Sequence, residues 1–408
     1  MAITSARGKS FLFTGKLDRF PRGVAERHVE LLGGTNARSA SAKLDVLVVG
    51  DAGSPLLGAG AKSKKHAQVE AFNAKGASIE IISESQFARL VEVAAPAPKR
   101  APRPLTITLL RSREDAYAQG TESLDAVASS GTRLFAACGQ TVCASDDGAV
   151  WRGIRDQDDH CTYVVLSATA KRVDSGEFGY CAVTAAGSRV WVGGYGFVLR
   201  SDDAGASFRL QETAELWRPV CMLEAGERLF VGGDPVGLMV SDGGAPFREI
   251  KVAGNDRFSG AVHTAMGPVL LRWKRAWLLL GDKPLRLSLR PAAELYGGCV
   301  TPGGALLLLG PTSYWTRNWV DFHEVECPGM MRSAAALADG GIVAGGDDDQ
   351  LFVSWDDGRS FDRVDHGYRG RAERGSGDTQ QYPRAFTVLR HGDAVIATGA
   401  FQATLRIE

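Results

Sequence analysis

The sequence lacks several features that mark particular classes of protein. Its 7 cysteines include no C-x-x-C pair, which argues against a zinc ribbon and gives no sign of a disulfide framework. No apolar run approaches the roughly 18 residues that suggest a membrane-spanning helix. The chain starts MAITSARGKS, without an apolar segment after the basic residues, so we expect no secretory signal. We therefore expect a cytoplasmic protein with free thiols and no membrane partner.

The sequence also has no excess charge of either sign, because 47 Lys and Arg balance 47 Asp and Glu. This balance conceals an asymmetry along the chain. Residues 1–104 hold 16 basic and 9 acidic residues, a net charge of +7, which leaves −7 for the rest. A basic segment joined to an acidic one suggests that the N-terminal part meets a polyanion, and the charge alone leaves open whether this is nucleic acid, a phosphopeptide or the other domain.

A proline-rich segment divides the chain. Residues 94–104 read AAPAPKRAPRP, with four prolines in eleven residues. Such a segment continues neither a helix nor a central strand, and it favours an extended spacer. We predict a first domain over residues 1–92, a linker over 93–104 and a second domain over 105–408.

The first domain alternates strand and helix signals. Apolar runs at 10–14, 45–50 and 78–82 predict buried strands, and a short strand is expected near 36–40. Helices are expected after Pro21, over 62–75, and after Ser83, which has capping-box spacing with Gln86. The pattern predicts a small α/β domain with a parallel four-stranded sheet and flanking helices.

Residues of the first domain resemble those of the BRCT family. The resemblance is carried by Thr14-Gly15, Arg22, Gly33-Gly34, the segment SAK at 41–43 and the run DVLVVGD at 45–51. It covers residues 8–92 and is strongest with the subgroup found in NAD-dependent DNA ligases and in the large subunit of the eukaryotic clamp loader. In that subgroup a Thr-Gly pair ends the first strand, an arginine lies in the first helix and a lysine opens the second.

The same residue types suit a phosphate group on chemical grounds. Thr14 offers a hydroxyl, Gly15 lets the backbone approach an anion, and Arg22 can donate two parallel hydrogen bonds. Lys62 and Lys65 add positive charge near the expected start of a helix, where the helix dipole is also positive. We predict that these five residues form a phosphate-binding site. The alternative is a domain used only for protein packing, in which Thr14 merely closes a turn.

The second domain is built from a repeat. Seven times a small turn is followed by an apolar strand that ends in glycine, at residues 131–139, 187–194, 226–233, 274–281, 303–310, 340–346 and 392–399. A unit of about 38–40 residues made of short strands is typical of one propeller blade. We predict an all-β, seven-bladed propeller. The run LTITLL at 105–110 would supply the fourth strand of the last blade and remove an exposed sheet edge.

A second pattern, S-x-D-x-G-x-x-aromatic, follows several of these strands. It is complete around Asp203 and Asp356, recurs with the serine replaced around Asp146 and Asp242, and is lost over 254–325. It resembles the Asp-box, or BNR, repeat of sialidase-type and photosystem-assembly-type propellers. Because Ser and Asp in such turns bond to backbone groups, we expect a structural role for all four aspartates.

We expect no enzyme, no cofactor and no metal site. A sialidase carries a Phe/Tyr-Arg-Ile-Pro stretch before its first blade, whereas the nearest string here, LWRP at 216–219, stands within a repeat. A DNA ligase would need a Lys-x-Asp-Gly motif, which the sequence lacks. The acidic run at 347–349 is interpreted as a solvated turn. A glycan-acting enzyme is the remote alternative.

Two long connections, 154–179 and 365–383, are expected on one face of the propeller. Connections of this length are uncommon unless they are functional or disordered. The second holds residue types that are favoured in protein interfaces. The candidate interaction loop consists of Tyr368, Arg369, Arg371, Arg374 and Tyr382.

These patterns together predict a non-catalytic binding or adaptor protein. The first domain would bind a phosphate, and the resemblance implies the 5′-phosphate end of DNA, in repair or replication. The propeller would bind a protein that the sequence does not identify. Two alternatives stay open: the same pocket binds a phosphorylated protein, or the whole chain is a structural scaffold.

Overall fold

The computed structural model describes most of the chain in two compact units, of which the first holds the residues up to Ala97 and the second holds most of those from Pro98 onward. Among the residues it describes, no helix is long and apolar enough to cross a membrane. Apart from the single residues Asp115, Ala118 and Leu124, the described ranges are 5–51, 63–93, 101–112, 126–138, 141–153, 180–194, 197–212, 218–234, 237–254, 256–289, 294–367, 386–399 and 403–408.

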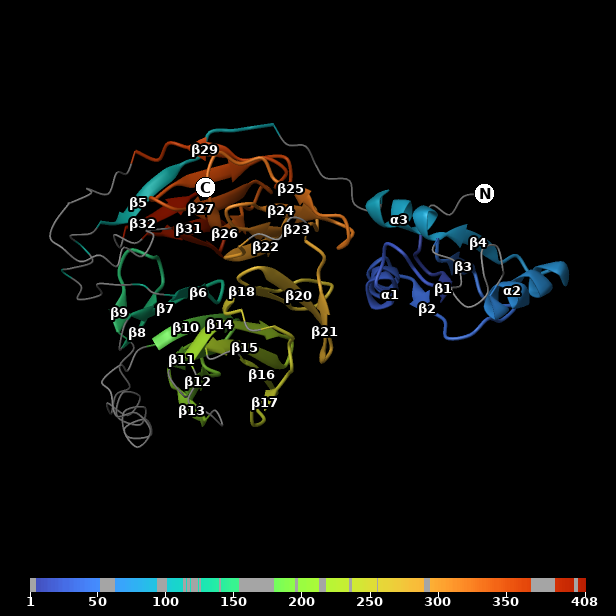
Figure 1. Cartoon of the computed structure of the whole chain (residues 1–408). Helices are drawn as coiled ribbons and strands as arrows, with labels where there is room; N and C mark the ends of the chain where they lie inside the picture. Colours follow the sequence, from blue (N-terminus) through green and yellow to red (C-terminus); the bar gives the residue numbers. More distant parts are fainter. Residues whose placement is uncertain are drawn as a thin grey trace. The chain divides into compact units, whose positions relative to one another are not determined.

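The N-terminal unit is a four-stranded parallel sheet with three helices in its described part (Figure 1). The strands lie in the order β2–β1–β3–β4, so the first strand is central. This confirms the α/β fold that was expected for the unit. The strands are β1 (Ser10–Thr14), β2 (Thr35–Asn36), β3 (Val46–Val49) and β4 (Glu80–Ser83), and the helices are α1 (Arg22–Leu31), α2 (Lys64–Ala74) and α3 (Glu84–Val93).

Local hydrogen bonds and ring packing explain where these elements begin. Ser63 caps α2 by accepting the N–H of His66 at 3.1 Å. At the start of α3, Ser83 and Gln86 form the expected capping box, with reciprocal bonds of 2.8 and 3.1 Å. Phe87 of α3 is fully buried, and its ring meets three other phenylalanine rings edge-on. These contacts hold α3 against the sheet.

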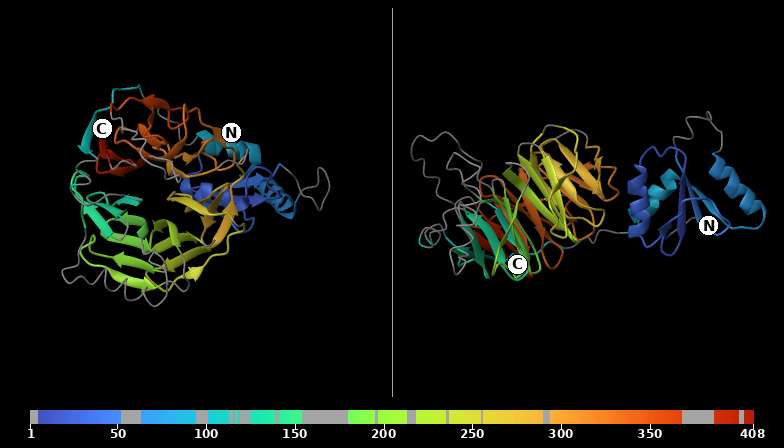
Figure 2. Two further views of the ribbon diagram at one scale, coloured as in Figure 1. Left: turned by 60° about the vertical axis from the view of Figure 1, so that its left-hand side comes forward. Right: turned by 90° about the horizontal axis from the view of Figure 1, so that it is seen from below.

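The second unit is a propeller of seven four-stranded blades, as the repeat predicts (Figure 2). The first three blades are β6–β9 (Ala126–Ser129, Leu134–Cys138, Thr141–Ser145, Arg152–Gly153), β10–β13 (Tyr180–Ala186, Arg189–Gly194, Phe197–Ser201, Arg209–Glu212) and β14–β17 (Arg218–Ala225, Arg228–Asp234, Gly237–Asp242, Arg248–Glu249). The next three are β18–β21 (Phe258–Val262, Val269–Arg272, Arg275–Leu280, Lys283–Arg286), β22–β25 (Gly297–Val300, Leu306–Leu309, Tyr314–Thr316, His323–Glu324) and β26–β29 (Met331–Ala336, Ile342–Gly346, Leu351–Ser354, Asp362–Val364).

The seventh blade closes the ring with a strand from the start of the unit. Its order is β30–β31–β32–β5, with bounds Thr387–His391, Ala394–Thr398, Thr404–Ile407 and Ile107–Arg111. β5 pairs antiparallel with β32, so that Ile107 lies opposite Ile407. The expected closure by the LTITLL segment is therefore confirmed, and β32 has no unpaired edge. Just before β5, Arg103 at the end of the predicted linker donates to a carboxylate oxygen of Asp339 at 2.5 Å.

The fourth blade departs from the repeat by one strand. In the other blades the glycine-ended run forms the second strand, but residues 274–281 contribute the third strand, β20. β20 then reverses into β21 through the two-residue turn Gly281-Asp282, in which Gly281 has φ of 64°. This short hairpin leaves no room for a longer Ser-x-Asp turn, which explains why the second pattern is missing here.

Two Ser-x-Asp turns have the hydrogen bonds that the pattern requires. Ser201 Oγ donates to Asp203 at 2.7 Å and accepts the N–H of Gly205 at 2.8 Å. The Asp203 carboxylate also accepts from the hydroxyl and the N–H of Ser207, at 2.6 and 2.9 Å. Asp356 makes the equivalent set of bonds with Ser354 and Ser360. In both turns the carboxylate takes the place of a missing backbone partner.

In the first blade the turn carboxylate belongs to Asp147, whereas the sequence pattern assigned it to Asp146. Ser145 Oγ donates to Asp147 at 3.1 Å, and the N–H groups of Ala149 and Val150 donate to the same oxygen. The serine is therefore present, and the turn is one residue shorter than its equivalents. The side chain of Asp146 is 82% exposed and pairs with Arg133 at 3.3 Å.

Asp242 in the third blade also differs from the expected role. Its carboxylate pairs with Arg228 at 2.6 Å and Arg248 at 3.0 Å, so it links strands through ion pairs. The turn itself is held by Ser241, whose Oγ donates to the carbonyl of Ala245 at 2.6 Å. The second of its two consecutive glycines, Gly244 with φ of 88°, allows this tighter turn without a carboxylate.

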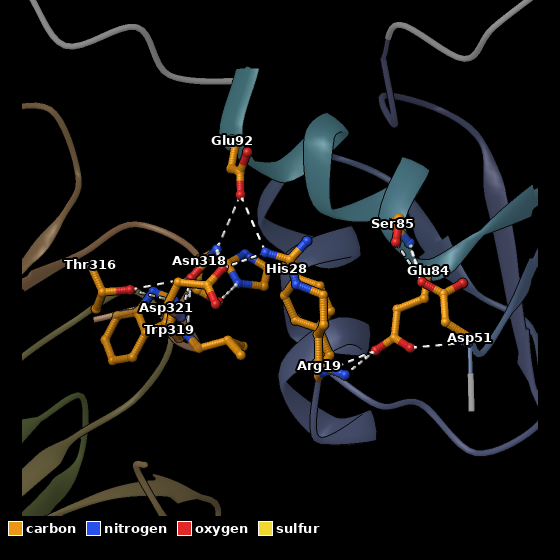
Figure 3. A network of polar contacts seen from close by, with 12 residues as sticks. Arg19, His28, Asp51, Glu84, Ser85, Glu92, Thr316, Asn318, Trp319 and Asp321 are labelled. Carbon is orange, nitrogen blue, oxygen red and sulfur yellow. Dashed lines mark hydrogen bonds and ion pairs between the residues drawn. The ribbon is translucent and has the colours of Figure 1, made fainter. Parts of the chain in front are cut away.

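The fifth blade retains the turn in a chemically altered form that the pattern missed. Thr316 and Asn318 replace the Ser and Asp, and Asn318 Oδ1 accepts from the N–H groups of Val320 and Asp321 at 3.0 and 2.8 Å (Figure 3). Trp319 has φ of 66°, matching Ala204 and Asp357 at the same position of the other turns, with φ of 56° and 65°. The amide oxygen of Asn318 thus accepts the turn N–H groups that a carboxylate oxygen accepts in the other turns.

Replacing Asp203 by asparagine is expected to lower propeller stability at neutral pH by roughly 1 kcal/mol, because a neutral amide makes weaker hydrogen bonds than a carboxylate. The effect stays small because solvent screens the charge at this exposed position. Hydrogen bonds from Ser207 and Ser201 lower the pKa of Asp203 from 3.8 to about 2. A lowered pKa stabilises the folded state above the unfolded pKa, and this stabilisation is lost as pH falls from about 4 towards 2. Urea unfolding at pH 7 and pH 3 measures the effect. Asp146→Asn is the control, and equal losses in both variants would contradict the assignment.

Candidate phosphate-binding site

Thr14 and Gly15 lie where β1 ends, at the carboxyl end of the parallel sheet. Thr14 is 5% exposed, and its hydroxyl oxygen lies 2.7 Å from that of Ser63. Gly15 has φ of 76°, a backbone conformation that favours glycine. The turn after β1 is therefore adjacent to the N-terminus of α2, whose first N–H groups point out of the helix.

Arg22 is held directly against this turn. It is the first residue of α1, and its guanidinium donates to the carbonyl of Phe13 at 3.0 Å and to that of Gly15 at 2.9 Å. These two bonds occupy two of the five donors that a guanidinium carries. Arg22 itself is solvent-exposed. A guanidinium bonded to the backbone and a buried hydroxyl thus lie at the same turn.

The two lysines of the predicted site have different outcomes. Lys62 lies outside the described residues, so its place in the site stays a prediction. Lys65 Nζ donates to the carbonyl of Arg38 at 3.4 Å, beyond β2, and not to Thr14 or Gly15. Ser63, which sequence reasoning did not assign to the site, stands between these lysines and contacts Thr14. A serine directly before a helical run is an N-cap signal that could have identified it.

A second residue missed by the sequence analysis is Glu84, the first residue of α3. Its carboxylate is fully buried and accepts four backbone N–H groups, from Asp18, Arg19, Phe20 and Asp51, at distances of 2.7 to 3.2 Å (Figure 3). Three of these donors belong to the loop between Gly15 and Arg22. No local sequence signal identifies this role, because the donors are backbone groups far along the chain.

The described part of the propeller contains a central cavity of about 570 Å³. The innermost strand of every blade lines it, mostly with small side chains, and Arg332 is the one charged residue among those that line it. Arg332 lies over the ring of Tyr296, with its guanidinium carbon 4.2 Å from the ring centre, and pairs with Asp347. Burial raises the pKa of the Cys221 thiol in this wall to about 12, so the thiol stays protonated at neutral pH.

The structure does not test the candidate interaction loop. Tyr368, Arg369, Arg371, Arg374 and Tyr382 lie outside the described residues, as does the connection 154–179. In the acidic run at 347–349, Asp347 pairs with Arg332, and Asp348 and Asp349 have φ of 53° and 55°, as in a turn. Within the described ranges, no three His, Cys, Asp or Glu side chains are grouped so that they could share a metal ion.

The N-terminal unit is similar to one region of DNA ligases, their BRCT region. It is 40% identical over 85 residues to the DNA ligase of Syntrophotalea carbinolica and 39% identical over 83 residues to that of Fusobacterium nucleatum. The matches cover 21% and 20% of this chain but only 11% and 10% of the ligases. The chain thus spans about a tenth of the length of the curated relatives it matches, and the likeness does not extend to their other regions. No family model matches the chain.

The propeller is similar in fold to two solved structures. YCF48 bound to a D1 peptide aligns with a TM-score of 0.51 at 14% identity, over 76% of this chain and 99% of that one. The WD40 β-propeller domain of Doa1 aligns with a TM-score of 0.52 at 12% identity, over 70% of this chain and 93% of that one. At such identities the likeness shows the fold alone.

Proposed function

We propose that this chain is a binding protein whose N-terminal unit holds a phosphate group, the 5′-phosphate end of DNA, at the Thr14-Gly15 turn. The observation that carries the proposal is the position of Arg22, whose guanidinium is tied to the backbone of that turn. The adjacent hydroxyls of Thr14 and Ser63 and the first turn of α2 supply neutral donors. The likeness to DNA ligases supports DNA over other phosphate carriers.

The propeller is proposed to bind a protein or peptide. Support comes from the cavity lined by all seven inner strands and from the solved structure of YCF48, which is bound to a D1 peptide. The predicted loop at 365–383 remains a candidate contact because it is rich in Tyr and Arg, which are favoured in protein interfaces. A protein that reads a phosphate with one unit and a polypeptide with the other would act as an adaptor, in DNA repair or replication if the phosphate belongs to DNA.

The full-length protein is expected to bind a duplex with a recessed 5′-phosphate end about tenfold more tightly than the same duplex with a 5′-hydroxyl, a difference of about 1.4 kcal/mol. Arg22→Ala should remove most of this preference, because it removes the fixed cation. Fluorescence anisotropy with a labelled duplex measures both affinities, and raising the salt concentration should weaken binding as phosphate contacts are screened.

Arg27→Ala is the matched control, because it removes the same charge from the same helix, where Arg27 pairs with Glu30. It should leave the preference for 5′-phosphate unchanged. Equal affinity of the wild type for both duplexes would overturn the proposal for DNA ends. Displacement of the duplex by a phosphopeptide, but not by its unphosphorylated form, would show that the pocket reads phosphate on proteins.

A further inference from the structure

A single buried carboxylate joins the two chain segments that border the proposed site. The Glu84 side chain is fully buried, and it makes no ion pair among the described residues. One of its oxygens accepts the N–H groups of Arg19 and Phe20, both at 2.8 Å. The other accepts from Asp18 at 2.7 Å and from Asp51 at 3.2 Å. Each carboxylate oxygen thus accepts two backbone N–H groups, so the hydrogen-bonding capacity of this buried side chain is satisfied.

The first three donors belong to the loop that carries the phosphate residues. This loop starts at Gly15 and ends at Arg22, so its shape sets how far the guanidinium lies from the Thr14-Gly15 turn. Phe20 anchors it a second time, since its buried ring meets that of Phe87 at 5.6 Å. The fourth donor, Asp51, follows β3, at the start of the segment that leads to Ser63 and α2.

The link between the two segments is completed by α3. Asp51 Oδ2 accepts the N–H of Ser85 at 3.2 Å and its hydroxyl at 2.5 Å, next to the bond between the Asp51 N–H and Glu84 (Figure 3). Asp51 therefore donates a hydrogen bond to the first turn of α3 and also accepts two from it. A change at Glu84 would release the loop before α1 and the chain after β3 together.

We infer that Glu84 is a positioning residue for phosphate recognition, which it serves by fixing the loop between Gly15 and Arg22 without touching the ligand. This inference rests on the proposed function. A purely structural carboxylate would change the stability of the unit and the affinity for every duplex alike. A positioning carboxylate changes the preference between phosphorylated and unphosphorylated ends, because only the former uses the Arg22 geometry.

Glu84→Gln tests the inference in the full-length protein. The variant keeps the shape but places an NH₂ group against backbone N–H donors, so one pair of bonds is lost. We expect the preference for the 5′-phosphate duplex to fall at least fivefold, while affinity for the 5′-hydroxyl duplex changes less than twofold. Glu30→Gln, an exposed carboxylate on α1, is the matched control and should keep the preference. Circular dichroism checks that each variant is folded at the temperature of measurement.

The outcomes separate the inference from the function on which it rests. If the wild type shows no preference, the proposed function fails. If the wild type shows it and folded Glu84→Gln keeps it, or loses affinity for both duplexes in parallel, the positioning role is overturned. Should Glu84→Gln fail to fold, Ser85→Ala loosens the same link through Asp51. It should reduce the preference at least twofold, and an unchanged preference in that variant would overturn the inference.

Discussion

Replacing Ile107 by aspartate is expected to destabilise the propeller by about 3 kcal/mol, the cost of placing an unpaired charge among apolar side chains. Ile107 packs against a buried cluster from the sixth and seventh blades that includes Leu351, Phe386 and Ile407. It lies on β5, the strand that completes the seventh blade, so the charge would weaken the closure of the ring. Thermal unfolding followed by circular dichroism should show a lower melting temperature.

Leu109→Asp supplies the control on the same strand. Leu109 is 49% exposed and lies two residues from Ile107. Both substitutions leave the backbone pairing of β5 with β32 in place and introduce the same charge. Leu109→Asp should change the free energy of unfolding by less than about 0.5 kcal/mol, as is usual for surface positions. If both variants lose the same stability, the packing of Ile107 does not account for the stability of the ring closure.

The closure of the ring could be predicted from the sequence because it follows from the number of strands available to each blade. Six complete blades and one incomplete blade leave one edge that must be paired, and the apolar run at 105–110 is long enough to pair it. The run at 274–281 forms the third strand of its blade, whereas the six other runs form the second, and the sequence pattern does not distinguish the two positions. An apolar strand that ends in glycine looks the same whether it is second or third in a blade, since both are buried on two faces.

The turns show where a residue pattern stops being informative. Asp146 and Asp147 are adjacent, and the spacing to Gly148 favoured Asp146, but the Ser145 hydroxyl reaches Asp147. Thr316 and Asn318 form the turn without matching its pattern. Several residue types can make the same hydrogen bonds in a turn. A fixed residue pattern therefore selected Asp146, which does not hold its turn, and overlooked the turn formed by Thr316 and Asn318.

For the proposed phosphate site, the sequence pointed to residues that would act through their own side chains. It did not point to Glu84, which bonds to backbone groups of a distant loop. Thr14, Gly15 and Arg22 are within nine residues and meet at one turn. Glu84 acts on a loop more than sixty residues away, through N–H groups that every residue carries. Such a contact depends on the pairing of β1, β3 and β4 and cannot be seen in a local pattern.

Gly50→Ala is expected to destabilise the N-terminal unit by about 3 kcal/mol and to reduce the preference for a 5′-phosphate about tenfold. A Cβ at Gly50 would lie 2.1 Å from the carbonyl oxygen of Lys16 and 2.5 Å from its carbon. The N–H of Gly50 also donates to the carbonyl of Thr14 at 3.0 Å. The backbone after Gly15 must therefore move if the new methyl group is to fit. Urea unfolding and duplex anisotropy of the full-length variant measure the two effects.

Gly8→Ala separates the effect of this close approach from the general cost of replacing a glycine. Gly8 has φ of 73°, and a Cβ there would meet no atom within 4 Å. Its replacement should cost roughly 1 to 2 kcal/mol of backbone strain and leave the phosphate preference intact. If Gly8→Ala lowers the preference as much as Gly50→Ala does, recognition follows the overall stability of the unit. If only Gly50→Ala lowers it, recognition depends on how closely the backbone just after β3 approaches the segment that follows Gly15.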